Sequence, residues 1–164
     1  RDLHLSLRRQ RQMCIRDRFH IDAIRGKDSP GLPRLEHAIK AHPKLNFIGH
    51  GPGWWASISG DCKSLGSYPK GPVTPGGAID RLMQRYPNIY GDLSAGSGAN
   101  SISRDKEFGR GFLVRRQDRL MFGTDYLQPG QPVPQFELFD NLDLPKVVQQ
   151  KVFRKNAARV LKLT

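Results

Sequence analysis

The stretch "RLMFGTDYLQ" (residues 119–128) shows the pattern on which the prediction of the fold depends. It is apolar over residues 120–122 and then breaks into Gly123, Thr124 and Asp125. A short apolar run that ends in glycine is typical of a buried strand. A carboxylate at the rim of a core costs free energy unless a partner compensates for its lost hydration. Asp125 therefore needs a helix N-terminus, a cationic side chain or a metal ion beside it.

Three further segments repeat this strand-like pattern: "FHID" (19–22), "KLNFIGHG" (44–51) and "NIYGDLS" (88–94). Apolar residues at helical spacing occupy the segments between these strands and after the last one. We predict helices over residues 32–43, 74–87, 102–116, 133–142 and 145–163. Residues 52–73 and 95–101 lack periodicity and are predicted to be loops, and Thr74 and Pro75 have the residue types that begin a helix.

Strands that alternate with helices indicate a parallel sheet with helices packed outside it. Two architectures satisfy this order, the doubly wound sheet and the (β/α)₈ barrel. Four βα units make half a barrel, and a complete barrel needs about 250 residues. The predicted fold class is therefore α/β, the truncated C-terminal half of a (β/α)₈ barrel. We expect four parallel strands in sequential order, with their inner apolar face exposed because half of the barrel is absent.

Residues 1–18, "RDLHLSLRRQRQMCIRDR", differ from the rest of the chain. They contain six Arg and two Asp, lack the architecture of a secretory signal, and include a string that resembles a translated sequencing adapter. We interpret residues 1–18 as a non-native tail and residues 19–164 as a partial barrel domain. A native basic arm is the alternative.

The 164 residues are 37% hydrophobic, and no apolar run approaches the roughly 20 residues of a membrane helix. Only Cys62 lies outside the tail, so neither a disulfide framework nor a Cys-x-x-Cys metal site is expected. A reducing, cytoplasmic location is the default expectation, without a membrane partner.

Polar residues follow each predicted strand at its carboxyl end: His20, His50, Asp92 and Asp125. In both parallel architectures this edge of the sheet is the active face. Two imidazoles and a carboxylate are a normal ligand set for Zn²⁺ or a similar divalent cation.

Five stretches closely resemble the amidohydrolase-related metal-dependent hydrolases, a branch of the amidohydrolase superfamily that also contains decarboxylases. They are "FHID", "HPKLNFIGHGPG", "YPNIYGDLSAGSG", "RLMFGTDY" and "NAARVLKL", which together span most of residues 19–163. The family fold is a (β/α)₈ barrel, and these segments resemble its strands five to eight with the last helix.

The resemblance implies a role for three residues. His20 matches the metal-binding histidine of strand five, and Asp125 matches the aspartate of strand eight, which binds the metal and accepts a proton. His50 matches the strand-six histidine, which stabilises charge or shuttles protons in single-metal members and is a ligand in two-metal members. The first-strand His-x-His pair of the family has no counterpart, since "LHL" (3–5) is not that motif. We therefore expect this chain alone to be inactive.

Simpler structural roles exist for each candidate. His20 can be an ordinary histidine, His50 a turn residue between two glycines, and Asp125 a helix cap or the partner of an arginine. Asp92 is left unassigned, because an aspartate that ends a strand often binds loop amides. Trp54 and Trp55 are either pocket walls or loop anchors, while His37 and His42 are expected at the surface.

The resemblance implies a divalent metal, either zinc or manganese, and a small-molecule substrate. Hydrolysis of an amide, ester or lactone and decarboxylation both remain open, as does a homo-oligomer.

A different class, a basic nucleic-acid-binding domain, is suggested by the net charge of +12. Outside the tail, basic residues gather around one predicted helix: Arg104, Lys106, Arg110, Arg115, Arg116 and Arg119. Acidic residues are interleaved with them, however, and no aromatic stacking platform is visible there. A solvated helix face explains the cluster better, so no nucleic-acid partner is expected.

Overall fold

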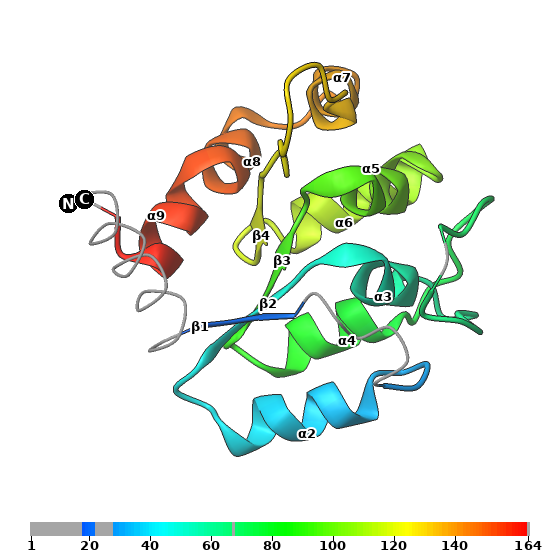
Figure 1. Ribbon diagram of the computed structural model, residues 1–164, viewed down its shortest axis with the longest axis vertical. Helices are drawn as coiled ribbons and strands as arrows, with labels where there is room; N and C mark the ends of the chain where they lie inside the picture. The colour runs from blue at the N-terminus through cyan, green and yellow to red at the C-terminus, as the bar shows by residue number, and fades with distance from the viewer. Residues whose placement is uncertain (1–17, 22–27, 67, 164) are drawn as a thin grey trace.

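A parallel sheet forms the centre of the fold (Figure 1). The structure, a computed structural model, describes residues 28–66 and 68–163 and the backbone of residues 18–21. The strands are β1 (Arg18–Ile21), β2 (Asn46–Gly49), β3 (Ile89–Asp92) and β4 (Leu120–Met121). They pair in the order β1-β2-β3-β4, and each pair is parallel. The predicted strand positions, direction and sequential order are confirmed. β1 begins and ends one residue earlier than predicted, and β2 to β4 are shorter than predicted.

Helical segments connect the strands and follow the last one. The α-helices are α2 (Pro33–Ala41), α3 (Gly51–Trp55), α4 (Ala78–Arg85), α5 (Ala95–Ser103), α6 (Lys106–Arg115), α7 (Pro134–Asp140), α8 (Lys146–Gln150) and α9 (Asn156–Leu161). A 3₁₀ turn, η1 (Ala56–Ile58), follows α3, and a π-helical turn, η2 (Lys151–Lys155), joins α8 to α9. Among the described residues, no helix is long and apolar enough to cross a membrane.

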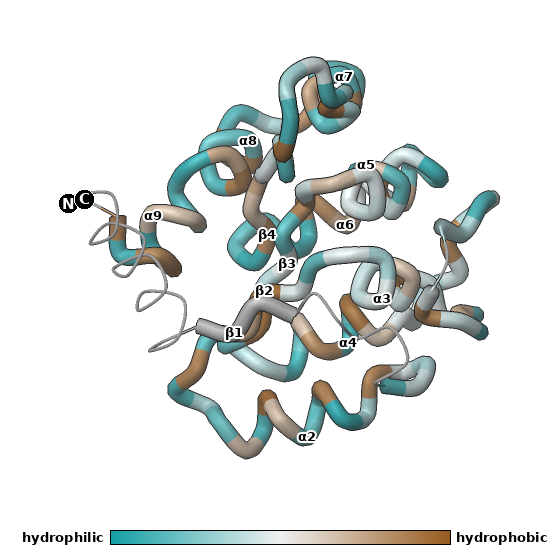
Figure 2. Tube along the Cα trace, in the orientation of Figure 1, coloured by the Kyte–Doolittle hydropathy of each residue, from teal (hydrophilic) through white to brown (hydrophobic). Residues whose placement is uncertain are grey.

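The main core lies between the sheet and the helices that connect its strands. Residues 47, 89 and 120, one from each of β2 to β4, point into this core. The predicted inward faces of three helical segments are also buried there: Leu35 and Ile39 of α2, Ile79 and Met83 of α4, and Val148 and Val152 of α8 and η2. Figure 2 shows apolar residues recurring along α2 and α4. The helical spacing of the sequence predicted these faces correctly.

The opposite face of the sheet corrects one expectation. Ile48, Tyr90 and Met121 alternate with the core residues and were expected to be exposed, but they are only 5–8% exposed. They form a second cluster with Val160 of α9, and Ala157 and Leu161 pack beside it. The C-terminal helix therefore contributes apolar side chains to this face, which a pattern of strands and helices does not reveal.

Two predicted loops contain helices. Residues 51–55 form α3, and residues 95–103 form α5. Trp54 is fully buried and Trp55 is 2% exposed. Both therefore anchor the core and do not form the wall of an exposed pocket. A side chain at Gly49 would collide with the Trp54 ring, which explains why β2 ends in glycine.

Helix α4 also begins later than predicted. Its N-cap is Gly77, and Thr74 and Pro75 lie in the preceding loop. A Cβ at Gly77 would overlap the Ile58 carbonyl, so the start of α4 packs against η1 too closely for a side chain at this position.

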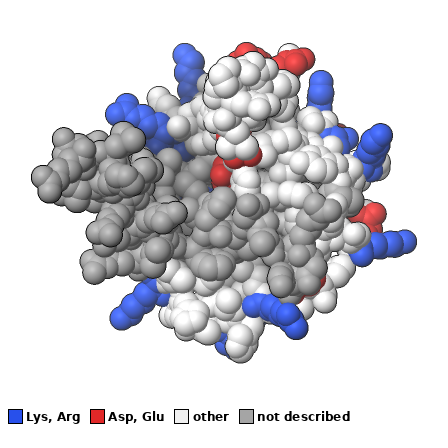
Figure 3. Space-filling view, viewed as in Figure 1, with Lys and Arg blue, Asp and Glu red and all other residues white. Residues whose placement is uncertain are grey.

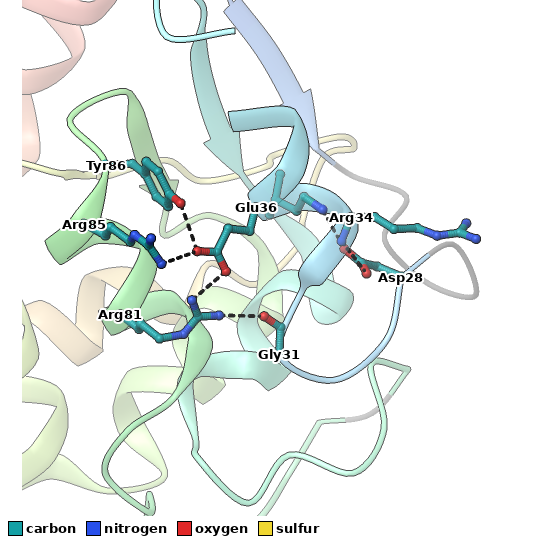
Figure 4. A network of polar contacts seen from close by, with 8 residues as sticks. Asp28, Gly31, Arg34, Glu36, Arg81, Arg85 and Tyr86 are labelled. Carbon is teal, nitrogen blue, oxygen red and sulfur yellow. Dashed lines mark hydrogen bonds and ion pairs between the residues drawn. The ribbon is translucent and has the colours of Figure 1, made fainter. Parts of the chain in front are cut away.

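A polar network joins α2 to α4 on the outside of the core (Figure 4). The Glu36 carboxylate accepts hydrogen bonds from Arg81 (2.6 Å), Arg85 (3.2 Å) and the Tyr86 hydroxyl (2.9 Å). The hydrogen bond from Arg81 contributes most to lowering the pKa of Glu36 below its usual value. The network thus holds the two neighbouring helices in register.

Most cations of the predicted basic cluster bond to acceptors of the protein itself. Arg115 and Arg116 both pair with Asp80, at 2.8 and 2.5 Å. Arg104 donates to the carbonyls of Gly71 and Pro72, Arg110 to that of Asp143, and Arg119 to that of Pro87. On the face in Figure 3, the described Lys and Arg side chains are spread around the rim rather than gathered in one patch. These contacts favour a structural role for the cluster.

Candidate functional site

The carboxyl edge of the sheet brings His50 and Asp92 together. His50 directly follows β2, and Asp92 is the last residue of β3. Neighbouring parallel strands end at the same edge, so residues far apart in the sequence meet there. The His50 Nδ1 atom lies 3.2 Å from Asp92 Oδ2 and 3.0 Å from the Ser94 hydroxyl oxygen. His50 and Ser94 are 8% and 3% exposed, whereas the Asp92 side chain is 23% exposed, so water reaches the cluster mainly at Asp92.

Asp92 is held by several donors. The Ser94 backbone N–H donates to Asp92 Oδ1 and the Ser94 hydroxyl donates to Oδ2, both at 2.9 Å. The indole N–H of Trp55 donates to the Asp92 backbone carbonyl at 2.9 Å. Asp92 therefore binds a loop amide, as a strand-ending aspartate often does, and contacts a candidate catalytic histidine as well.

The exit of β4 passes close to this cluster. A Cβ built on Gly123 would lie 2.9 Å from Asp92 Oδ1 and 3.0 Å from the Ser94 Cβ. Only a residue without a side chain fits there without displacing its neighbours. The glycine in "FGTD" thus allows the segment that leads to Asp125 to run beside Asp92.

Asp125 is neither a helix cap nor the partner of an arginine in the described part of the chain. It is partly exposed, and its backbone is left-handed, with φ of 52°. Its carbonyl accepts a hydrogen bond from the Gln131 amide at 2.7 Å. Within residues 28–66 and 68–163 its carboxylate makes no hydrogen bond or ion pair, and the N-cap of the next helix, α7, is Val133. Both simpler roles weighed from the sequence are therefore excluded for these residues.

The side chain of His20 lies outside the described residues, so its role as a ligand stays a prediction. The backbone places it in β1, paired with Ile48 two residues before His50. The predicted boundary of the tail at residue 18 also lies at the edge of the described residues and is not tested. His37 and His42 are exposed, as predicted.

Some of the residues needed for a metal site are present. Carboxylate and imidazole groups, the types carried by the predicted ligands Asp125 and His20, are hard or borderline donors that suit zinc or manganese. Among the described residues, however, no group of three or more His, Cys, Asp or Glu side chains could hold a metal ion. A complete ligand set needs further side chains, such as that of His20.

The sequence analysis identified His50 but did not assign Asp92 or Ser94. The pattern Asp-x-Ser directly after a strand is a local signal for side-chain hydrogen bonds to loop amides. It does not show that the same carboxylate faces a histidine 42 positions earlier. Only the pairing of β2 with β3 brings these groups into contact.

A model of the amidohydrolase family matches residues 12–163. The chain therefore belongs to the amidohydrolase family. A search of curated proteins gave no match.

Comparison with solved structures finds decarboxylases. One is 2,6-dihydroxybenzoate decarboxylase from Rhizobium, with 19% identity over 76% of this chain and 37% of that chain, and a TM-score of 0.40. Another is a dihydroxybenzoic acid decarboxylase from Polaromonas sp. JS666 with bound manganese and the inhibitor 2-nitroresorcinol. It is 20% identical over 79% of this chain and 38% of that chain, with a TM-score of 0.43. The present chain thus spans less than two fifths of either protein.

Proposed function

We propose that this chain forms part of a metal-dependent hydrolase that cleaves an amide, an ester or a lactone. The observation that carries the proposal is the cluster of His50, Asp92 and Ser94 at the carboxyl edge of the sheet, in which His50 and Ser94 are buried and Asp92 is partly exposed. This edge is where parallel α/β folds place their reactive groups. Membership of the amidohydrolase family supports hydrolysis as the reaction.

We also propose that the four strands correspond to strands five to eight of a (β/α)₈ barrel. Their sequential order without reversal supports this assignment, because a doubly wound sheet changes direction at a switch point. On this proposal the remaining strands and the His-x-His ligands come from outside the chain. The chain by itself is then inactive.

His20 and Asp125 are the residues that would hold a divalent metal, zinc or manganese. The support on this chain is that the Asp125 carboxylate has no partner among the described side chains. When bound, such an ion lowers the pKa of a coordinated water toward about 7 and polarises a substrate oxygen.

The protein side chains supply proton transfer and charge stabilisation. Asp125 accepts the proton that the attacking water loses. His50, once protonated on both ring nitrogens, donates a hydrogen bond from Nε2 to the oxygen on which negative charge develops. We expect the substrate to be a small molecule. A cytoplasmic location and a homo-oligomer remain predictions from the sequence.

Alanine variants of the complete protein test this assignment. We expect His20→Ala and Asp125→Ala to lower both bound metal, measured by elemental analysis, and turnover. His50→Ala should lower turnover by about 10²-fold or more and leave the metal content unchanged, provided that the site uses one ion. His42→Ala, at an exposed position, is the control and should change neither quantity.

Unchanged metal content in both His20→Ala and Asp125→Ala would contradict the ligand assignment. A panel of amides, esters and lactones tests for hydrolysis. 2,6-Dihydroxybenzoate is added as a probe for decarboxylation, because one of the similar solved structures is a 2,6-dihydroxybenzoate decarboxylase in complex with this compound. Release of CO₂ from this probe, with no hydrolysis in the panel, would replace the hydrolase by a decarboxylase.

A further inference from the structure

We propose that Asp92 and Ser94 are positioning residues that keep a proton on Nδ1 of His50 and thereby make Nε2 the atom through which His50 acts. The reaction that His50 serves rests on the proposed function. The position of the proton follows from the contacts of Nδ1 alone.

The two oxygens that face Nδ1 in the described part of the chain both accept a hydrogen bond from it. Asp92 Oδ2, at 3.2 Å, belongs to a carboxylate and has no proton to give. The Ser94 hydroxyl oxygen, at 3.0 Å, has a single proton, which it donates to Asp92 Oδ2 at 2.9 Å. An unprotonated Nδ1 would set its lone pair against the carboxylate. The arrangement is satisfied when Nδ1 carries the proton and shares it between these two oxygens.

The orientation of Asp92 is fixed independently of His50. Its Oδ1 atom accepts from the Ser94 backbone N–H, and its backbone carbonyl accepts from Trp55, each at 2.9 Å. Gly123 lies so close to Oδ1 that even a methyl group would not fit without a shift. The carboxylate is thus held between the ends of β2, β3 and β4 and cannot easily turn away from the imidazole.

This arrangement defines what neutral His50 can do. With Nδ1 protonated, the lone pair lies on Nε2, and this nitrogen accepts a proton or donates one after protonation. Ser94 links His50 and Asp92, since it accepts from Nδ1 and donates to Asp92.

Replacement of Asp92 by asparagine should move the ring proton of neutral His50 from Nδ1 to Nε2. Oδ1 still accepts from the Ser94 amide, so the new NH₂ group takes the place of Oδ2. That group donates toward His50 Nδ1, which then has to be unprotonated. The proton of neutral His50 moves to Nε2.

The test is NMR of the metal-free chain labelled with ¹⁵N-histidine, at a pH where His50 is neutral. Long-range ¹H–¹⁵N spectra show which ring nitrogen carries the proton, and the loss of one pattern in His50→Gln assigns it. We expect protonated Nδ1 in the native chain and protonated Nε2 in Asp92→Asn. Asp118→Asn is the control, because Asp118 pairs with Lys151 at the surface and should leave the His50 pattern unchanged.

Neutral His50 protonated on Nε2 in the native chain would overturn the proposal, whether or not Asp92→Asn folds. An unchanged pattern in folded Asp92→Asn would also overturn it. Because no substrate or metal is present, loss of the hydrolase proposal would leave this result standing. Conversely, the wrong tautomer would leave the metal and turnover measurements unaffected.

Discussion

Gly123 and Asp125 belong to one short segment but face different constraints. Gly123 passes so close to the Asp92 carboxylate that no side chain fits. Asp125 lies two residues further, in a left-handed conformation that aspartate tolerates better than most residues. The segment that leaves β4 therefore leads to a carboxylate that serves neither a helix end nor an arginine in the described part of the chain.

We expect Gly123→Ala to destabilise the protein by about 1–3 kcal/mol, the usual cost of overpacking. The added methyl group would lie 2.9 Å from Asp92 Oδ1, so the cluster has to shift to accommodate it. Denaturant unfolding followed by circular dichroism measures the change in the free energy of unfolding.

Gly111→Ala is the matched control for this substitution. Gly111 lies within α6, and the nearest atom to its added Cβ would be the flexible Arg115 guanidinium, 3.9 Å away. Alanine is a better helix former, so this variant should gain about 0.5–1 kcal/mol. Equal effects of the two substitutions would show that the close approach at Gly123 is unimportant.

At the scale of elements, α9 covers part of the sheet face that a half barrel was expected to expose. Val160 is 4% exposed and packs with Ile48, Tyr90 and Met121. Arg159, from the same helix, lies over the Tyr90 ring at 5.7 Å from its centroid. The helix thus protects apolar strand residues from water.

We expect Val160→Ala to lower the free energy of unfolding by about 1–2 kcal/mol, because it removes two buried methyl groups and leaves a gap against the sheet. Binding of a hydrophobic dye should rise as the sheet face becomes more accessible. Val147→Ala in α8, at a position 52% exposed, makes the same chemical change without that burial and should have little effect. If the two variants behave alike, α9 does not protect this face.

At the scale of the whole molecule, the net charge of +12 raises the question of whether a basic surface is available to a nucleic acid. Outside residues 1–18, most of the clustered arginines donate to carbonyls or carboxylates of the protein itself. A cation engaged in this way is less available for a phosphate.

We therefore expect weak binding to duplex DNA and little dependence on the sequence of the DNA. Fluorescence anisotropy at several salt concentrations measures the affinity and its salt slope. Removal of residues 1–18 should reduce any slope, since these residues carry six arginines. A steep slope that persists without them would favour the nucleic-acid-binding alternative.

The sequence by itself determined the order of strands and helices, the buried faces of α2, α4 and α8, and the candidates His50 and Asp125. These features depend on local periodicity and on the residue types that end strands, and both can be identified from residues that are neighbours in the sequence. Helices α3 and α5 were missed because they are short and rich in glycine and serine, so packing rather than propensity stabilises them.

Only the tertiary structure decided which side chains meet at the edge of the sheet. Parallel pairing of β2 with β3 brings Asp92 and Ser94 to His50, and the route of β4 makes Gly123 necessary beside them. It also places α9 against a strand face that the sequence pattern left uncovered. These contacts join residues that are distant in the sequence, so no local sequence pattern predicts them. The pairing and register of the strands determine how close the contacting side chains lie.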